Sequence, residues 1–128
     1  MRLPVLCALA VTALISGCSS TKEAPRSSEM KPLAVMERVA IAANRCWFKS
    51  GDASFAAYRL APELNSFSGT PRILVVKKHS PEALPLLVVQ ASGSPAELST
   101  FGPLLKDGNL AARVNHDVQR WALGSSGC

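Results

Sequence analysis

The sequence has few aromatic residues, little charge and no long apolar run, and each shortage excludes a class of protein. Phe, Trp and Tyr make up only 5% of the 128 residues, and charged residues make up 18%. So few aromatic residues disfavour nucleic-acid binding. No internal stretch reaches the roughly 18 apolar residues of a membrane-spanning helix, which argues against a polytopic membrane protein. The hydrophobic fraction of 48% excludes a disordered chain, and the length predicts a single domain.

Motifs for catalysis and metal binding are missing too. The two histidines, His79 and His116, form no His-x-His or His-Glu-x-x-His pattern, so a zinc site lacks ligands. There is no Gly-x-Ser-x-Gly elbow, no glycine-rich phosphate loop and no Cys-x-x-Cys pair. His116 and Asp117 are neighbours on an expected helix, where consecutive side chains diverge, and this favours a solvated face over a catalytic dyad. We therefore expect no enzymatic activity, no metal and no cofactor.

The N-terminus is typical of an exported protein. Arg2 precedes an almost unbroken apolar run to Ile15, which fits a secretory signal peptide and is too short to span a bilayer. The run closes on Leu14-Ile15-Ser16-Gly17-Cys18, an aliphatic residue and two small residues before a cysteine. This segment resembles the lipobox of bacterial lipoproteins. The alternative is an ordinary signal peptide with a chance cysteine.

The lipobox resemblance implies a lipid anchor. Residues 1–17 would be removed, and Cys18 would become the first mature residue, carrying diacylglycerol and a further acyl chain such as palmitate. Several acyl chains on one residue exceed what stable membrane attachment requires. The next residue is Ser19 rather than the Asp that resembles an inner-membrane retention signal, so we expect the outer membrane. Both the periplasmic and the outward-facing orientation remain open.

A tether and one domain follow. Residues 18–32 are rich in Ser and Pro without an apolar period, so they predict a flexible tether that spans roughly 20 Å on average. A structured arm over residues 29–31 is the alternative. The folded domain is then expected over residues 33–128.

The periodicity of the domain predicts an α+β fold. Apolar residues of Leu33–Phe48 recur at spacings of 3, 4 and 7, which indicates an amphipathic helix. A second helix is expected over Leu110–Leu123, after capping residues at Asp107. Between them we expect three to four strands, at residues 55–64, 73–76, 86–89 and, less regularly, 98–101. The predicted architecture is a small antiparallel sheet of three to four strands with two helices on one face, in the order α-β-β-β(-β)-α.

The two most apolar strands do not alternate between apolar and polar residues. A sheet covered on one face should alternate, so one set of apolar side chains faces away from the helices. That set is a possible partner strip: Leu74, Val76, Leu86 and Val88. Either a loop or a strong twist covers the strip, or it stays exposed for a partner, a lipid or a second copy.

The cysteines predict one disulfide. Cys7 leaves with the signal peptide and Cys18 carries lipid, which leaves Cys46 and Cys128 as a pair in an oxidising compartment. The alternative is a redox or catalytic thiol, but no histidine neighbours either cysteine in the sequence.

The basic residues predict an anionic partner. Residues 33–128 carry ten Lys and Arg against seven Asp and Glu, and the densest cluster is Lys77-Lys78-His79. At an envelope surface this cluster favours lipopolysaccharide phosphates or acidic polysaccharide. Ordinary solvated side chains are the alternative.

Asn44-Arg45-Cys46-Trp47 and the closing Cys128 resemble small alphaproteobacterial lipoproteins without assigned activity. With the lipobox, this resemblance implies a non-enzymatic, lipid-anchored module at the outer membrane or cell surface. Such a module would dock cells, vesicles or surface polymers. The alternative function is a periplasm-facing accessory or assembly subunit of an envelope complex, whose partner is another envelope protein.

Overall fold

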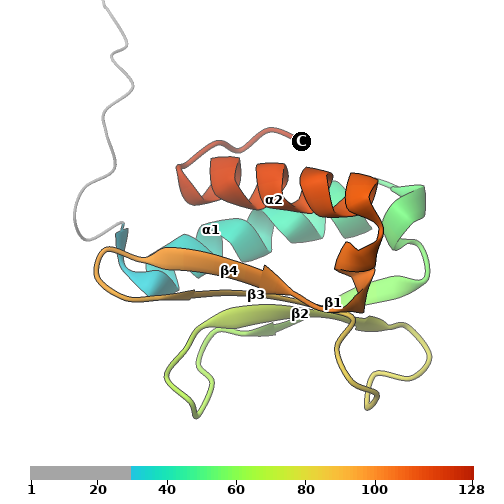
Figure 1. Cartoon of the computed structure of the whole chain (residues 1–128), viewed down its shortest axis with the longest axis horizontal. Helices are drawn as coiled ribbons and strands as arrows, with labels where there is room; N and C mark the ends of the chain where they lie inside the picture. The colour runs from blue at the N-terminus through green and yellow to red at the C-terminus, as the bar shows by residue number, and fades with distance from the viewer. Residues whose placement is uncertain (1–29) are drawn as a thin grey trace, which may run out of the picture.

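Two helices cover one face of a four-stranded antiparallel sheet, as Figure 1 shows. The computed structural model describes residues 30–128, so the expected signal peptide, Cys18 and most of the tether lie outside the described residues. The helices and strands are, in chain order, α1 (Pro32–Ala43), β1 (Tyr58–Glu63), β2 (Arg72–Lys77), β3 (Leu87–Ser92), β4 (Glu97–Phe101) and α2 (Gly108–Ala122). The predicted α+β class and the order α-β-β-β-β-α are confirmed.

The first helix, α1, is followed directly by a turn of π-helix. Pro32 occupies the first turn of α1, where its missing N–H has no intrahelical partner to lose. After Ala43 the chain continues as a wider π-helical turn, Asn44–Phe48, which carries Cys46 and Trp47. Such turns occur as single bulges within helices. The turn places both side chains against the core, because Cys46 is 5% and Trp47 0% exposed.

The sheet is a simple meander in which each strand pairs with the next along the chain. Its core face is formed by alternate residues, and the fully buried ones include Ile73 and Val75 on β2 and Leu87 and Val89 on β3. Ile73 pairs with Val89 and Val75 pairs with Leu87, so these four residues form one apolar block under the helices. This register assigns the other set of alternate residues to the opposite face.

Aromatic packing joins the π-helical turn to α2 and to the short 3-10 turn Ala53–Phe55. Trp47 stacks on Phe55 with ring centroids 4.8 Å apart and meets Trp121 of α2 at 5.1 Å. The N-terminus of α2 is capped by Asp107, whose carboxylate accepts hydrogen bonds from the N–H groups of Asn109 and Leu110. Neither α1 nor α2 has the length and apolar character that crossing a membrane requires.

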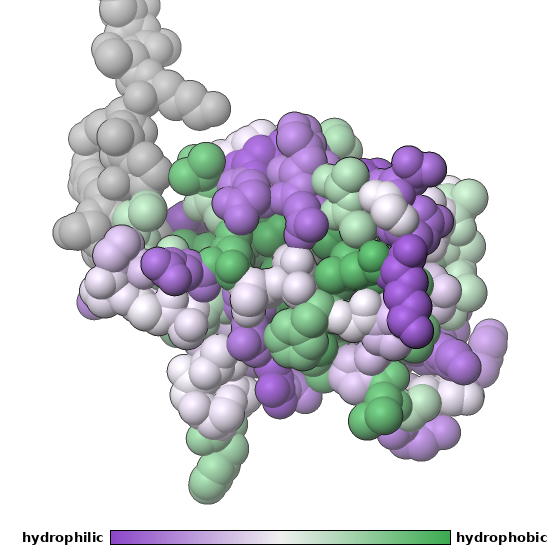
Figure 2. All heavy atoms as spheres, in the orientation of Figure 1, coloured by the Kyte–Doolittle hydropathy of each residue, from purple (hydrophilic) through white to green (hydrophobic). Residues whose placement is uncertain are grey.

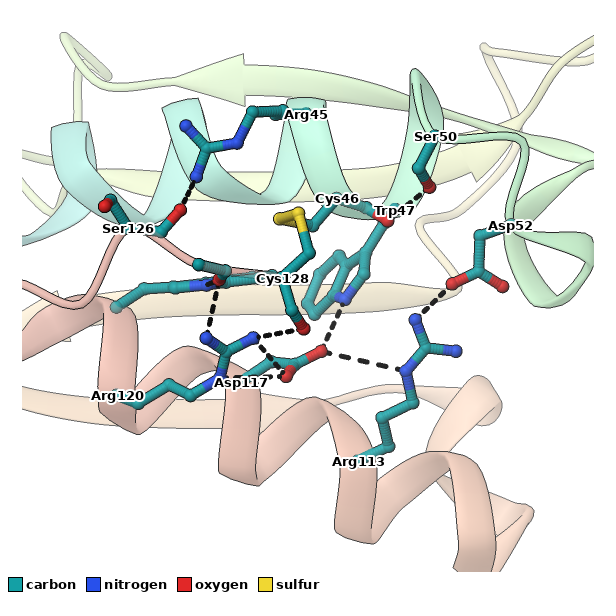
Figure 3. Close-up of a disulfide and its surroundings, with 12 residues drawn as sticks. Arg45, Cys46, Trp47, Ser50, Asp52, Arg113, Asp117, Arg120, Ser126 and Cys128 are labelled. Carbon is teal, nitrogen blue, oxygen red and sulfur yellow. Dashed lines mark hydrogen bonds and ion pairs between the residues drawn. A yellow bond between two sulfur atoms is a disulfide. The ribbon is translucent and has the colours of Figure 1, made fainter.

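The predicted disulfide between Cys46 and Cys128 is present, with a Cα–Cα distance of 5.3 Å. It holds the C-terminal segment across the helix layer, as Figure 3 shows. Side chains of α2 secure the same segment: Trp121 Nε1 donates to the carbonyl of Gly127 at 2.9 Å, and Arg120 donates to the carbonyl of Cys128 at 2.8 Å. The C-terminal segment is therefore joined to the π-helical turn by a covalent bond and to α2 by polar contacts.

Candidate binding surface

The sheet face that points away from the helices carries a row of apolar residues across all four strands. We call this surface the helix-free face. Ala61 of β1 pairs with Leu74 of β2, which pairs with Val88 of β3, which pairs with Phe101 of β4. None of the four belongs to the core cluster beneath the helices. Phe101 is the most open member of the row, with 48% of its surface exposed.

Three members of the predicted strip lie on the helix-free face by their register, and their exposure differs. Val76 and Val88 are buried, with 3% and 8% exposed, whereas Leu74 is half-buried. Leu86 precedes β3 and is also half-buried. Its N–H donates to the carbonyl of Val75 at 2.8 Å, and its carbonyl accepts from Leu104 at 3.0 Å. The strip is therefore together in space, but only part of it is accessible.

Two loops flank the helix-free face and project away from the helices, as Figure 1 shows below the sheet. The Phe67 loop (residues 64–71) joins β1 to β2, and the Leu84 loop (residues 78–86) joins β2 to β3. Phe67 is fully exposed and Leu84 is 87% exposed. Figure 2 shows hydrophobic atoms at the ends of separate projections on this side of the molecule. The most accessible apolar side chains are thus in the loops, where strand periodicity gives no signal.

The predicted basic cluster lies at the end of the sheet that carries the Leu84 loop. Lys77, Lys78 and His79 are all exposed, and Lys78 also donates from Nζ to the carbonyl of Ala56 at 2.9 Å. Arg59 also lies at this end, because it pairs with Val76 in the sheet register, and its side chain is exposed. Sequence reasoning missed Arg59, since its proximity to Lys77 arises only from strand pairing.

The densest cluster of ionisable groups lies between α2 and the π-helical turn. Asp117 is buried and its carboxylate accepts from Trp47 Nε1 at 3.0 Å and from Arg120 at 2.9 Å (Figure 3). His116 points to solvent, so the sequence interpretation of a solvated pair holds for His116 and is wrong for Asp117. Because the Asp117 carboxylate already accepts these hydrogen bonds, we assign this cluster a structural role.

A second ion pair, between Arg113 and Asp52, borders the same cluster. The hydrogen bond that Arg113 donates holds the pKa of Asp52 below its ordinary value, and the same bond raises the pKa of Arg113. An open hollow of about 480 Å³ lies beside Arg113. Asp107 also lines this hollow. Its carboxylate caps the N-terminus of α2, so an anionic group already occupies that helix end. Within residues 30–128 no group of three or more His, Cys, Asp or Glu side chains could hold a metal ion.

Comparison with known proteins finds no relative: no protein-family model matches the chain, and no curated protein or solved structure is significantly similar to it.

Proposed function

We propose that this chain is a lipid-anchored, non-enzymatic docking module of the bacterial outer membrane. The apolar run and the lipobox-like segment ending at Cys18 support export and attachment. The disulfide between Cys46 and Cys128 supports the same location, because such bonds persist in oxidising compartments.

One observation carries the docking role: the helix-free face combines accessible apolar side chains with a cation at one end. Phe101 and Leu74 present apolar surface there, and Arg59, which pairs with Val76, is exposed on the same face. Lys77 is exposed at the same end of the sheet, but it pairs with Tyr58 and so lies on the helix side by its register. A surface that joins apolar and cationic groups fits an anionic partner, whether an envelope polymer or a membrane.

The anchor is tested by the mass of the processed chain and by envelope fractionation. We expect Cys18 to carry lipid, and Cys18→Ala to abolish both the lipid mass and membrane retention. Cys7→Ala is the matched control, because Cys7 lies inside the expected signal peptide. Retention of Cys18→Ala in the membrane fraction at the wild-type level would contradict the anchor.

The docking role is tested by deleting the gene and measuring cell and vesicle attachment. We expect attachment to fall, and to return with the wild-type chain and with Ile41→Ser, which alters an exposed residue of the helix layer. Phe101→Ser should restore it only in part. Attachment that is unchanged by the deletion would overturn the role.

Protease shaving of intact cells separates this role from the alternative. A docking module that faces outward is digested, whereas an accessory subunit that faces the periplasm survives. Crosslinking in intact envelopes, followed by pull-down, then identifies the partner.

A further inference from the structure

The two most exposed large apolar side chains of residues 30–128 are Phe67 and Leu84. Each lies in a loop that projects on the helix-free side of the sheet (Figure 1). Neither belongs to the core cluster nor packs against it, so the fold gains nothing from their apolar character. Two exposed apolar side chains that project from the same side of the molecule make that side a candidate interaction surface, together with Phe101 of the sheet between them.

Both loops are held by internal hydrogen bonds. In the Phe67 loop, the hydroxyl of Ser66 donates to the carbonyl of Thr70 at 2.9 Å, and the N–H of Gly69 donates to the carbonyl of Ser66 at 3.0 Å. In the Leu84 loop, Ala83 N–H donates to the carbonyl of Ser80 at 3.1 Å. Loops that are ordered in advance lose little conformational entropy when their side chains meet a partner.

The positions of the loops fit a flat partner. The Phe67 loop precedes β2 and the Leu84 loop follows it, so the two loops lie at opposite ends of this strand. The six residues of β2 separate them by about 20 Å. A protein partner would need two apolar pockets at this separation. A lipid bilayer needs none, because its interface accepts apolar side chains at any point on a plane.

The charges at one end fit an anionic bilayer. Arg59 and Lys77 are exposed, and they outnumber Glu82, the one acidic residue of the Leu84 loop. The nearby carboxylate of Asp52 is already paired with Arg113. At the other end, Arg72 is paired with Glu63 at 2.6 Å and adds little net charge, and Glu97, which is on the same face as Phe101, is exposed. The end with Arg59 is therefore the one that would face the anionic headgroups. Cations beside an apolar loop are attracted to anionic lipid headgroups.

We infer that the helix-free face docks on an anionic phospholipid bilayer, with Phe67 and Leu84 inserted at its two ends and Arg59 at the headgroup phosphates. The inference rests on the proposed function, which places the domain at a membrane. The twelve residues from Cys18 to Glu29 extend at most about 40 Å, so the lipid anchor would keep the helix-free face within reach of the bilayer.

The test measures the binding of the folded domain after it has been separated from its anchor. The full chain is prepared with a specific protease site in place of residues 22–27, and its tether is cut after purification. The released domain is then sedimented with vesicles of phosphatidylcholine, either alone or mixed with phosphatidylglycerol. We expect binding to the mixed vesicles only, and weaker binding as salt rises.

Single substitutions locate the contact. We expect Phe67→Ser and Leu84→Ser each to lower the bound-to-free ratio about tenfold, because each removes one inserted side chain. Arg59→Gln should lower it about fivefold and reduce the salt dependence. The matched controls are Ile41→Ser and Lys49→Gln, which change an exposed apolar residue and an exposed cation of the helix layer. Both should bind as the wild type does.

Three results would overturn the inference. The first is equal binding to both kinds of vesicle, or binding to neither. The second is a loss with Ile41→Ser as large as the loss with Phe67→Ser. The third is a dimer in size-exclusion chromatography that Phe67→Ser dissociates, which would make a second copy the partner. The mass of Cys18 is measured on the same preparation, so failure of the anchor and failure of the bilayer contact are distinguishable.

Discussion

Trp47 and Asp117, which are 70 residues apart, are joined by a buried hydrogen bond of 3.0 Å from the indole N–H to the carboxylate. Trp47 comes from the π-helical turn and Asp117 from the middle of α2, so the bond fixes how the two helical segments meet. Arg120 adds two hydrogen bonds to the other oxygen of the same carboxylate, at 2.9 and 3.2 Å. The carboxylate is thus a shared acceptor at the junction of the helix layer and the C-terminal segment.

Removing this carboxylate should destabilise the domain. Asp117→Ala leaves the Trp47 N–H without its acceptor and removes two hydrogen bonds of the Arg120 guanidinium, and we expect a loss of about 3 kcal/mol in the free energy of unfolding. Urea unfolding monitored by tryptophan fluorescence measures it. Gln119→Ala, an exposed change on the same helix, should stay within about 0.5 kcal/mol of the wild type. Equal stability of the two variants would show that the buried bonds contribute nothing.

The disulfide should contribute a comparable amount to the free energy of unfolding. It closes a loop across 82 residues, so the double change Cys46→Ser and Cys128→Ser frees the unfolded chain. We expect a loss of about 2 to 4 kcal/mol, measured by urea unfolding at neutral pH. The hydrogen bonds from Arg120 and Trp121 remain, so the folded variant should keep its C-terminal segment in place. Rapid exchange of the amides of residues 125–128 in the variant would show otherwise.

Protonation of Asp52 in acid should lower the free energy of unfolding. Its pKa is lower in the folded chain than its ordinary value of 3.8, chiefly because Arg113 donates a hydrogen bond to it. The contribution is therefore complete above pH 3.8 and is lost as the pH falls through the lower, folded-state pKa. Arg113 is 41% exposed, and solvent screening limits the effect to about 0.5 kcal/mol.

Substitution at Asp52 isolates this effect. Unfolding free energies at neutral pH and near pH 3 should differ less in Asp52→Asn than in the wild type. Glu37→Gln, a change at an exposed position of α1, should keep the wild-type difference. If Asp52→Asn and the wild type lose the same unfolding free energy between neutral pH and pH 3, Asp52 does not contribute to the acid sensitivity.

Gly102 should tolerate no side chain. Its φ is +133°, and an added Cβ would lie 2.4 Å from the carbonyl oxygen of Leu86, a backbone atom. We expect Gly102→Ala to cost about 3 kcal/mol through strain and a clash beside the strip residue Leu86. Gly108→Ala is the matched control, because a Cβ there meets nothing within 4 Å and the position is helical. It should be neutral or raise stability by up to about 1 kcal/mol. Thermal unfolding compares the two, and similar midpoints would refute the clash.

The sequence predicted the elements well because their patterns are local. The apolar spacing of the second helix identified its buried side, where Val114, Val118 and Trp121 have at most 1% of their surface exposed. The disulfide was predictable because only two cysteines remained for the domain. The strand predicted at residues 86–89 was displaced, since β3 spans Leu87–Ser92 and includes the polar Gln90. Apolar runs locate a strand but do not show where its hydrogen bonding stops.

Other features depend on contacts between distant residues, and the sequence did not predict them. Asp117 reads as a surface residue of a helix, because its partner Trp47 is remote in the chain. Phe67 and Leu84 lie in loops where no period exists to classify them. An isolated apolar residue among Ser, Gly and Pro was the available signal for Phe67, whereas Leu84 is followed closely by the apolar residues of the next strand. The burial of Val76 and Val88 required knowledge of how the sheet packs.

The bond between Cys46 and Cys128 also determines how the domain would carry a mechanical load. Residues 47–127 lie inside a covalent ring. The covalent path of a pull applied between the N-terminal side of α1 and residue 128 therefore runs along α1 and across the two sulfur atoms, so such a pull can lengthen only the chain before Cys46. Force that entered through a partner on the helix-free face would take another route, because it would pass through the strands.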